Sequence, residues 1–280
     1  MERATRAGWA HCRRVVVVGT AVVCLAAVSH AAAQAVGPSP TEREVYRAFQ
    51  AGQYERADQL IADARKAGPL ADTLVALLAR RALERCRWDE AMAVPDSSMS
   101  LGSRIAALFA RGLGAARSAW PGGQVGPISA ARQAAQRLER LSQAEGPGGR
   151  ADVARTLVLA GIAAAQEERD ELALLLAHAV DLDPDAGENA STIPQLPLPV
   201  HEVAGDLWLQ VDRYDDAIRE YEATLARYPD RARAWLGLGR AAAKAGDLPR
   251  ARDAFTAFLE AWSAADADLP ERDEAVAQLR

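Results

Sequence analysis

The stretch RYDDAIREYEATLARYPD, residues 213–230, has a counterpart 34 residues further along the chain, DLPRARDAFTAFLEAWSA, residues 247–264. In both stretches an alanine is followed four residues later by an aromatic residue: Ala217 and Tyr221, then Ala251 and Phe255. Residues four apart lie on one face of an α-helix, so each stretch predicts a helix that places a small and a large side chain together. A spacing that recurs after 34 residues indicates stacked helical repeats.

The two stretches belong to longer units, residues 201–229 and 234–262, which align with a shift of 34. The alignment resembles the tetratricopeptide repeat, a helix–turn–helix unit with the pattern W-x2-L-G-x2-Y, then A-x3-F, then P. Ala242 departs from this pattern, as do His201 and Ala204. The residues that match it are Gly205, Trp208, Ala217, Tyr221 and Pro229 in the first unit and Trp235, Leu238, Gly239, Ala251 and Phe255 in the second.

Helix packing explains this spacing. Gly205 and Gly239 carry no side chain, so the second helix of a pair can lie close to the first. Tyr221 and Phe255 are large and are predicted to fill the space between pairs, while Pro229 ends a helix because proline lacks the N–H group and clashes with the preceding turn. One pair cannot bury its apolar face alone, which is why such units recur.

Weaker copies of the unit occupy residues 46–69, 78–96 and 156–185, and two amphipathic helices are expected at residues 103–118 and 129–143. We therefore predict an all-α fold, a right-handed α-solenoid of about six helix pairs with a capping helix near the C-terminus. Its predicted parts are N-terminal repeats at residues 38–101, a degenerate pair with loop insertions at 102–150, and C-terminal repeats with the capping helix at 151–280.

Three stretches interrupt the repeats: residues 120–127, 146–149 and 187–199. The last separates units that are offset by 45 residues instead of 34. Insertions in solenoid proteins form loops, some of them on the binding face. The alternative interpretation of residues 187–199 is a flexible or polyproline-like connection.

Residues 1–34 have the pattern of a secretory signal peptide: four arginines, an apolar run at residues 15–28, and an alanine-rich end. A transmembrane anchor is the alternative, although the run is shorter than the ~20 residues that a spanning helix needs. The pattern predicts a periplasmic or secreted protein without stable membrane insertion after cleavage. Cleavage would remove four arginines and one glutamate, so the net charge of −5 would become −8. An acidic chain is a poor partner for nucleic acid.

No motif in the chain predicts catalysis. His178 and His201 fall on different predicted helices, without a cluster of ligands at metal-binding spacing. We expect no catalytic residue, no metal and no cofactor, and hence no enzyme. Cys86 would be the single cysteine left after cleavage and is expected to be a small core side chain, with a reactive thiol as the alternative.

The concave surface that stacked repeats form is the remaining candidate for function. The resemblance implies a scaffold that binds protein or peptide partners, in envelope assembly or secretion. A helical accessory domain of an envelope enzyme and a self-associating homo-oligomer stay open as alternatives. The residues expected to line the surface near the C-terminus are Glu202, Asp206, Leu209, Gln210, Arg233, Leu236, Arg240 and Lys244.

Overall fold

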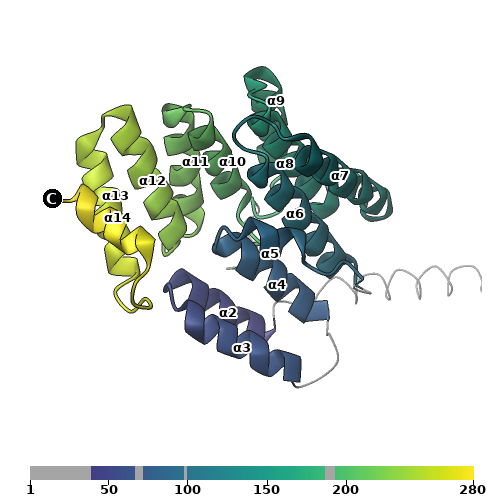
Figure 1. The fold of residues 1–280 in the computed structure, drawn as a ribbon, viewed down its shortest axis with the longest axis horizontal. Coiled ribbons are helices and arrows are strands. Elements are labelled where there is room, and N and C mark those ends of the chain that lie inside the picture. Colours follow the sequence, from purple (N-terminus) through teal and green to yellow (C-terminus); the bar gives the residue numbers. More distant parts are fainter. Residues whose placement is uncertain (1–38, 67–71, 98–99, 187–192) are drawn as a thin grey trace, which may run out of the picture. The chain divides into compact units, whose positions relative to one another are not determined.

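The computed structural model describes residues 39–66, 72–97, 100–186 and 193–280. Its regular structure in those ranges is helical throughout (Figure 1). The predicted signal peptide at residues 1–34 lies outside the described residues, as does the start of the insertion at residues 187–199. The described helices belong to one compact unit, residues 40–280.

Thirteen helices, α2 to α14, follow one another through the described ranges and pack in adjacent pairs (Figure 1). The first three pairs are α2 (Pro40–Gln50) with α3 (Tyr54–Lys66), α4 (Asp72–Glu84) with α5 (Trp88–Met92), and α6 (Leu101–Ser118) with α7 (Val125–Glu145). The next three are α8 (Arg150–Ala165) with α9 (Arg169–Asp181), α10 (Val200–Gln210) with α11 (Tyr214–Arg227), and α12 (Ala232–Ala245) with α13 (Leu248–Ala261).

Helix α14 (Pro270–Gln278) follows the sixth pair. The predicted all-α fold, with about six pairs and a capping helix, is therefore confirmed. One boundary was wrong: α7 begins at Val125, so residues 125–127 continue into a helix instead of belonging to an interruption.

The start of α13 shows how the sequence sets a helix end. The side chain of Asp247 accepts a hydrogen bond from the backbone N–H of Arg250, 3.2 Å away, and so satisfies one of the free donors of the first turn. Pro249 stands in the same turn, where its missing N–H group costs nothing. Apolar residues then recur on one face and bury Ala251, Ala254, Phe255 and Phe258.

Glycines and aromatic rings meet where the repeat pattern places them. A Cβ atom on Gly205 would lie 2.9 Å from the ring of Tyr221, and one on Gly239 would lie 2.8 Å from the ring of Phe255. The Tyr221 ring also touches the next pair, because a Cβ atom on Gly237 would lie 2.3 Å from its Cζ atom. Tyr221 therefore packs between α10 and α12 and is fully buried.

The described part of the insertion, residues 193–199, is packed against the protein. Leu196 and Leu198 are buried, and Arg80 of α4 donates hydrogen bonds to the carbonyl oxygens of Pro194, Leu196 and Pro197 at 2.6–3.1 Å. Burial lowers the pKa of Arg80. The interpretation of this stretch as a flexible connection is therefore wrong for residues 193–199.

The first helix pair contacts the last one, which we call the head-to-tail contact (Figure 1). The indole N–H of Trp262 donates to the carbonyl oxygen of Gln50 at 3.1 Å, and its ring packs edge-on against Tyr54. Asp266 accepts a hydrogen bond from the N–H of Glu55 at 2.9 Å, at the start of α3. Gly52 allows this approach, because a Cβ atom there would lie 2.8 Å from the Trp262 ring.

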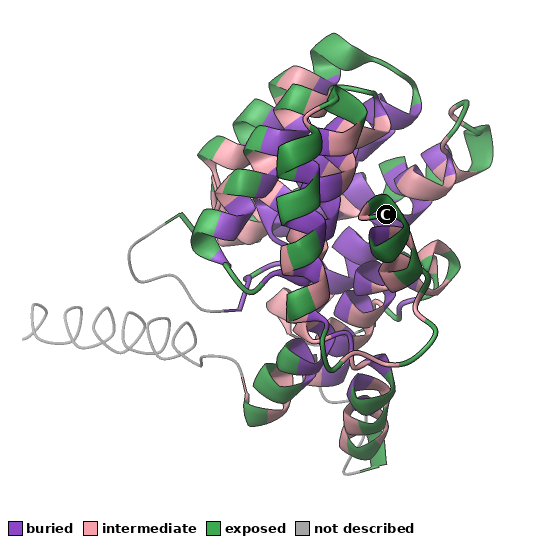
Figure 2. Cartoon of the chain, turned by 90° about the vertical axis from the view of Figure 1, so that its left-hand side faces the viewer, coloured by how far each residue is buried: buried purple, intermediate pink, exposed green. Residues whose placement is uncertain are grey.

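Buried residues follow the inner faces of the helices, and exposed residues cover their outer faces (Figure 2). The core consists mainly of alanine, leucine and valine, with a few aromatic side chains such as Phe109, Tyr221 and Trp262. None of the described helices combines the length and the hydropathy needed to cross a membrane.

Candidate binding pocket on the inner helices

A buried network of four charges joins the N-terminal and C-terminal repeats. Arg231, just before α12, donates to Glu202 of α10 at 2.5 and 2.7 Å and to Glu84 of α4 at 2.7 and 3.0 Å. These three side chains are each about 1% exposed. Arg233 lies beside them, 3.4 Å from Glu202, and donates to the carbonyl oxygen of Glu84 at 2.7 Å. Two arginines thus balance two glutamates.

Burial alone would raise the pKa of Glu202, but Arg231 and Arg233 outweigh it and hold that pKa below its usual range. Glu202 is therefore a buried ion-pair partner, and the expectation that it lines an accessible surface was wrong. Leu236 is only 3% exposed, so it also belongs to the core. The burial of Glu202 follows from the contact between the end of α4 and the residues at the start of α12, across 147 residues of sequence.

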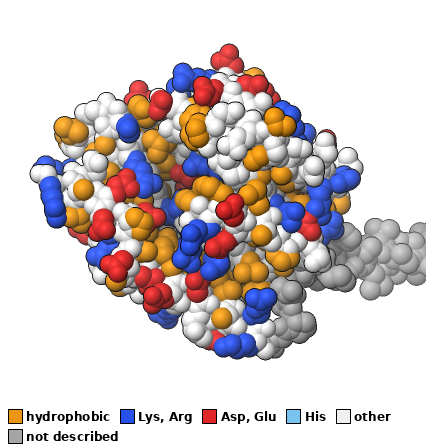
Figure 3. Space-filling view, viewed as in Figure 1, with side chains coloured by type: hydrophobic (Ala, Val, Ile, Leu, Met, Phe, Trp, Pro, Cys, Tyr) orange, Lys and Arg blue, Asp and Glu red, His pale blue; other side chains and the backbone are white. Residues whose placement is uncertain are grey.

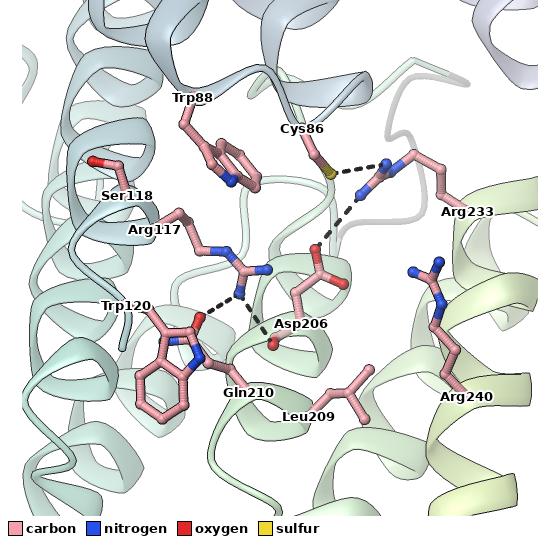
Figure 4. Close-up of a pocket in the computed structure, with 10 residues that line it drawn as sticks. All are labelled: Cys86, Trp88, Arg117, Ser118, Trp120, Asp206, Leu209, Gln210, Arg233 and Arg240. Atoms are coloured by element: carbon pink, nitrogen blue, oxygen red, sulfur yellow. Dashed lines mark hydrogen bonds and ion pairs between the residues drawn. The ribbon is translucent and has the colours of Figure 1, made fainter. Parts of the chain in front are cut away.

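A pocket of about 500 Å³ lies next to this network (Figure 4). Its walls come from the first helices of three pairs, α6, α10 and α12, and from the region around the α4–α5 turn. The lining residues are Cys86, Trp88, Arg117, Ser118, Trp120, Asp206, Leu209, Gln210, Arg233 and Arg240.

Arg117, at the end of α6, reaches across the pocket to α10. It donates to the side-chain oxygen of Gln210 at 2.7 Å and to the backbone oxygen of Asp206 at 3.3 Å. Its guanidinium lies over the ring of Trp88, 5.3 Å from the centroid, in a cation–π arrangement. Among the described residues no carboxylate forms an ion pair with Arg117.

On the opposite wall the charges are compensated. The carboxylate of Asp206 accepts from the hydroxyl of Tyr221 at 2.7 Å and lies 3.7 Å from Arg233. Figure 4 shows this carboxylate turned toward Arg233, while the backbone oxygen of Asp206 faces Arg117. Arg240 makes a two-point ion pair with Glu274 of α14 at 2.5 and 2.7 Å.

Cys86 differs from the expectation for it. It is exposed, in the turn between α4 and α5, with a backbone φ of 50°. Its sulfur accepts a hydrogen bond from Arg233 at 3.4 Å. The expectation of a core side chain was wrong, because residue 86 occupies the left-handed conformation of a turn and not a helix interior.

The structure thus brings together five of the residues expected on the binding surface: Asp206, Leu209, Gln210, Arg233 and Arg240. Lys244 lies elsewhere, in a surface hollow near the α10–α11 turn with Asp212, Arg213 and Asp216. Sequence reasoning missed Trp88, Arg117 and Trp120. Trp88 and Trp120 flank predicted turns, and a tryptophan next to a turn is the one signal that could have singled them out.

Among the described residues no group of three or more His, Cys, Asp or Glu side chains could hold a metal ion. His201 lies outside the lining, with its Nδ1 atom 2.7 Å from Glu220. The face in Figure 3 carries acidic and basic side chains interspersed, without one large patch of a single sign.

Comparison with known proteins supports the repeat assignment. The family model of the tetratricopeptide repeat matches residues 203–266, which include α11, α12, α13 and most of α10. A search of curated proteins gave no match to the chain. Tetratricopeptide repeats are in general non-catalytic modules that bind other proteins on extended concave surfaces. The matched repeats supply Asp206, Leu209, Gln210, Arg233 and Arg240 to the pocket.

Proposed function

We propose that this protein is an exported, non-catalytic scaffold that binds a protein or peptide partner through the pocket on its inner helices. The observation that carries the proposal is the lining itself: Trp88, Trp120 and Arg117 converge there from the second and third helix pairs, opposite the repeats that match the family model. The N-terminal sequence pattern supports a location in the periplasm or outside the cell, in envelope assembly or secretion.

Residue type and burial favour binding at this place. Tryptophan and arginine are enriched among the few interface residues that dominate affinity, and such residues lie in pockets that exclude water. The described pocket is lined by two tryptophans and three arginines. Its volume of about 500 Å³ is within the range of specific ligand pockets, roughly 300–1,000 Å³. A short segment of a partner therefore fits better than a flat protein surface.

The test compares partner capture by the native chain and by two matched tryptophan variants. Trp120→Ala removes a wall of the pocket. Trp235→Ala removes a half-buried tryptophan whose indole N–H donates to the carbonyl oxygen of Pro229 and which does not line the pocket. Partners captured from an envelope extract and quantified by mass spectrometry should be lost with Trp120→Ala and kept with Trp235→Ala.

Capture that survives Trp120→Ala would reject the pocket as the binding site. If the chain instead captures only its own copies, its molecular mass in sedimentation should rise with concentration. That result would reject the scaffold function in favour of a self-associating protein. Export is tested separately by the N-terminal residue of protein isolated from its native host. Intact Met1 on the bulk of that protein would contradict cleavage of residues 1–34.

A further inference from the structure

Two side chains of the pocket have unused hydrogen-bonding capacity: Arg117 has no negatively charged acceptor, and the Gln210 side-chain nitrogen has no acceptor at all among the described residues. Arg117 donates only to neutral oxygens, one of Gln210 and one of the backbone. The side-chain nitrogen of Gln210 is buried and has no hydrogen-bond partner among the described residues. A buried N–H group without a partner costs about as much as a lost hydrogen bond. The two donors are neighbours, because Arg117 donates to the side-chain oxygen of the same Gln210 amide whose nitrogen has no partner.

The charge balance around the pocket limits what these donors can hold. Arg231 and Arg233 balance Glu84 and Glu202, and Arg240 balances Glu274. Arg117 and Asp206 remain, and the Asp206 carboxylate is already engaged by Tyr221 and Arg233. The four arginines and the four carboxylates therefore cancel in number, but Arg117 forms no ion pair with any described residue, so its guanidinium is the one available to a carboxylate of a ligand. A dianionic phosphate would bring a second charge that has no counterpart beside Asp206.

We propose that Arg117 and Gln210 hold one carboxylate of the bound segment, with an adjacent aromatic or apolar side chain of that segment between Trp88, Trp120 and Leu209. This proposal rests on the binding function proposed above and specifies the chemistry of the anchor. Arginine pairs with a planar carboxylate through two parallel N–H groups. Figure 4 shows the Arg117 guanidinium between the Trp88 ring and the Gln210 side chain, so an anion there would meet both donors beside an aromatic wall.

The carboxylate has two possible sources, a chain end or an acidic side chain, and three small probes separate them. N-acetyl-phenylalanine offers a terminal carboxylate, N-acetyl-glutamyl-phenylalanine amide a side-chain carboxylate, and N-acetyl-phenylalanine amide neither. Binding is followed on the full chain through the indole N–H resonances of Trp88 and Trp120 in NMR spectra. At least one acid should bind about tenfold or more tightly than the neutral amide, because a hydrogen bond to a charged group is involved.

Two arginine variants form the matched pair. Arg117→Gln should abolish the preference for the acid, whereas Arg252→Gln, at an exposed position of α13, should preserve it. Gln210→Glu guards against a variant that fails to fold. It places an internal carboxylate beside Arg117, so acid binding should be lost while the melting temperature is kept or raised.

Equal binding of acid and amide would overturn the proposal, as would an acid preference that persists in Arg117→Gln, or the absence of binding by all three probes. Each of these results leaves the function proposed above standing if Trp120→Ala still abolishes partner capture. If Trp120→Ala leaves partner capture unchanged while the acid probes still bind, the proposed partner-binding function is overturned and the carboxylate site is kept.

Discussion

Tyr221 connects three helices through its ring and its hydroxyl. The ring meets Gly205 of α10 and Gly237 of α12, and the hydroxyl donates to Asp206. Burial, followed by the charge of Asp206, raises the pKa of Tyr221 well above its ordinary value, so it stays protonated as a donor. The hydrogen bond fixes the ring, so it cannot move aside when a neighbour grows.

Gly237→Ala should therefore destabilise the protein by about 1–3 kcal/mol, the range for an overpacked core. The added Cβ atom would lie 2.3 Å from Tyr221 Cζ, which outweighs the ~1 kcal/mol that alanine gains over glycine in a helix. Gly126→Ala in α7 is the control, because a Cβ atom there would meet nothing within 4 Å. Urea unfolding that shows Gly237→Ala to be as stable as the control would contradict the packing of Tyr221 between the two helices.

His201 gives the molecule a pH-dependent contact. Its hydrogen bond to Glu220 raises the pKa of His201, burial acts against this, and the charges of Glu220 and Asp183 add to the increase. A raised pKa means that the contact stabilises the fold fully below the unfolded value of about 6.5. This contribution is lost as the pH rises through the folded pKa.

The stability difference between the native chain and His201→Gln should thus be larger at pH 5.5 than at pH 8. Chemical denaturation at both pH values measures it, and titration of the His201 ring by NMR should give a midpoint above about 6.5. A stability difference that grows with pH would show that the neutral imidazole is the stabilising form.

At the scale of elements, the segment at residues 193–199 depends on α4. Arg80 donates to three backbone oxygens of that segment, and its guanidinium lies over the ring of Tyr46 at 5.1 Å. Arginine suits this role because its fork of donors is planar and fixed, whereas lysine presents a single ammonium. Helix α4 thereby holds a connection that lies more than 110 residues further along the chain.

Arg80→Lys should speed amide hydrogen exchange at residues 193–199 and lower the stability by roughly 1.5–3 kcal/mol, the value of hydrogen bonds to a charged group. Arg56→Lys in α3 is the control, since Arg56 is exposed. Hydrogen exchange with mass spectrometry separates the two variants. Unchanged protection of residues 193–199 in Arg80→Lys would mean that the buried Leu196 and Leu198 hold the segment without Arg80.

The elements were largely predictable because their signals are local. Ala217, Tyr221 and Gly205 lie within 16 residues of one another, so a repeat pattern records their contact. The pocket was predictable only on the side of α10 and α12, where Asp206, Leu209, Arg233 and Arg240 belong to matched repeats. Arg117 faces Gln210 across 93 residues, and no local period encodes that distance.

At the scale of the whole described unit, contacts extend beyond neighbouring helix pairs. Each repeat of a solenoid is expected to contact only its neighbours. Here Glu84 pairs with Arg231, and Gln50 accepts from Trp262, although 147 and 212 residues separate them. Buried ion pairs of this kind carry no sequence period, so Glu202 was assigned to an accessible surface when its partner was in fact Arg231.

Trp262→Ala should destabilise the protein by about 3–5 kcal/mol, as expected for removal of a large buried aromatic side chain. The loss should be felt first in α2 and α3, because Trp262 packs against Tyr54 and bonds to Gln50. Hydrogen exchange should therefore show lost protection at residues 40–66. Leu138→Ala, in the buried face of α7, is the comparison and should leave the exchange of α2 and α3 close to native. Equal loss in both variants would contradict a specific link between the two ends.

The head-to-tail contact also sets an order of events during protein synthesis. The backbone N–H of Glu55 at the start of α3 cannot bond to Asp266 until a further 211 residues have been synthesised. At a ribosome speed of 5–20 residues per second, that delay is roughly 10–40 s. Throughout this interval α2 and α3 can pack against each other and against α4, but Trp262 and Asp266 have not yet been made. We therefore expect a chain truncated before Trp262 to be cleaved first within residues 40–66, because the contacts of Gln50, Tyr54 and Glu55 with the last helix pair would be missing.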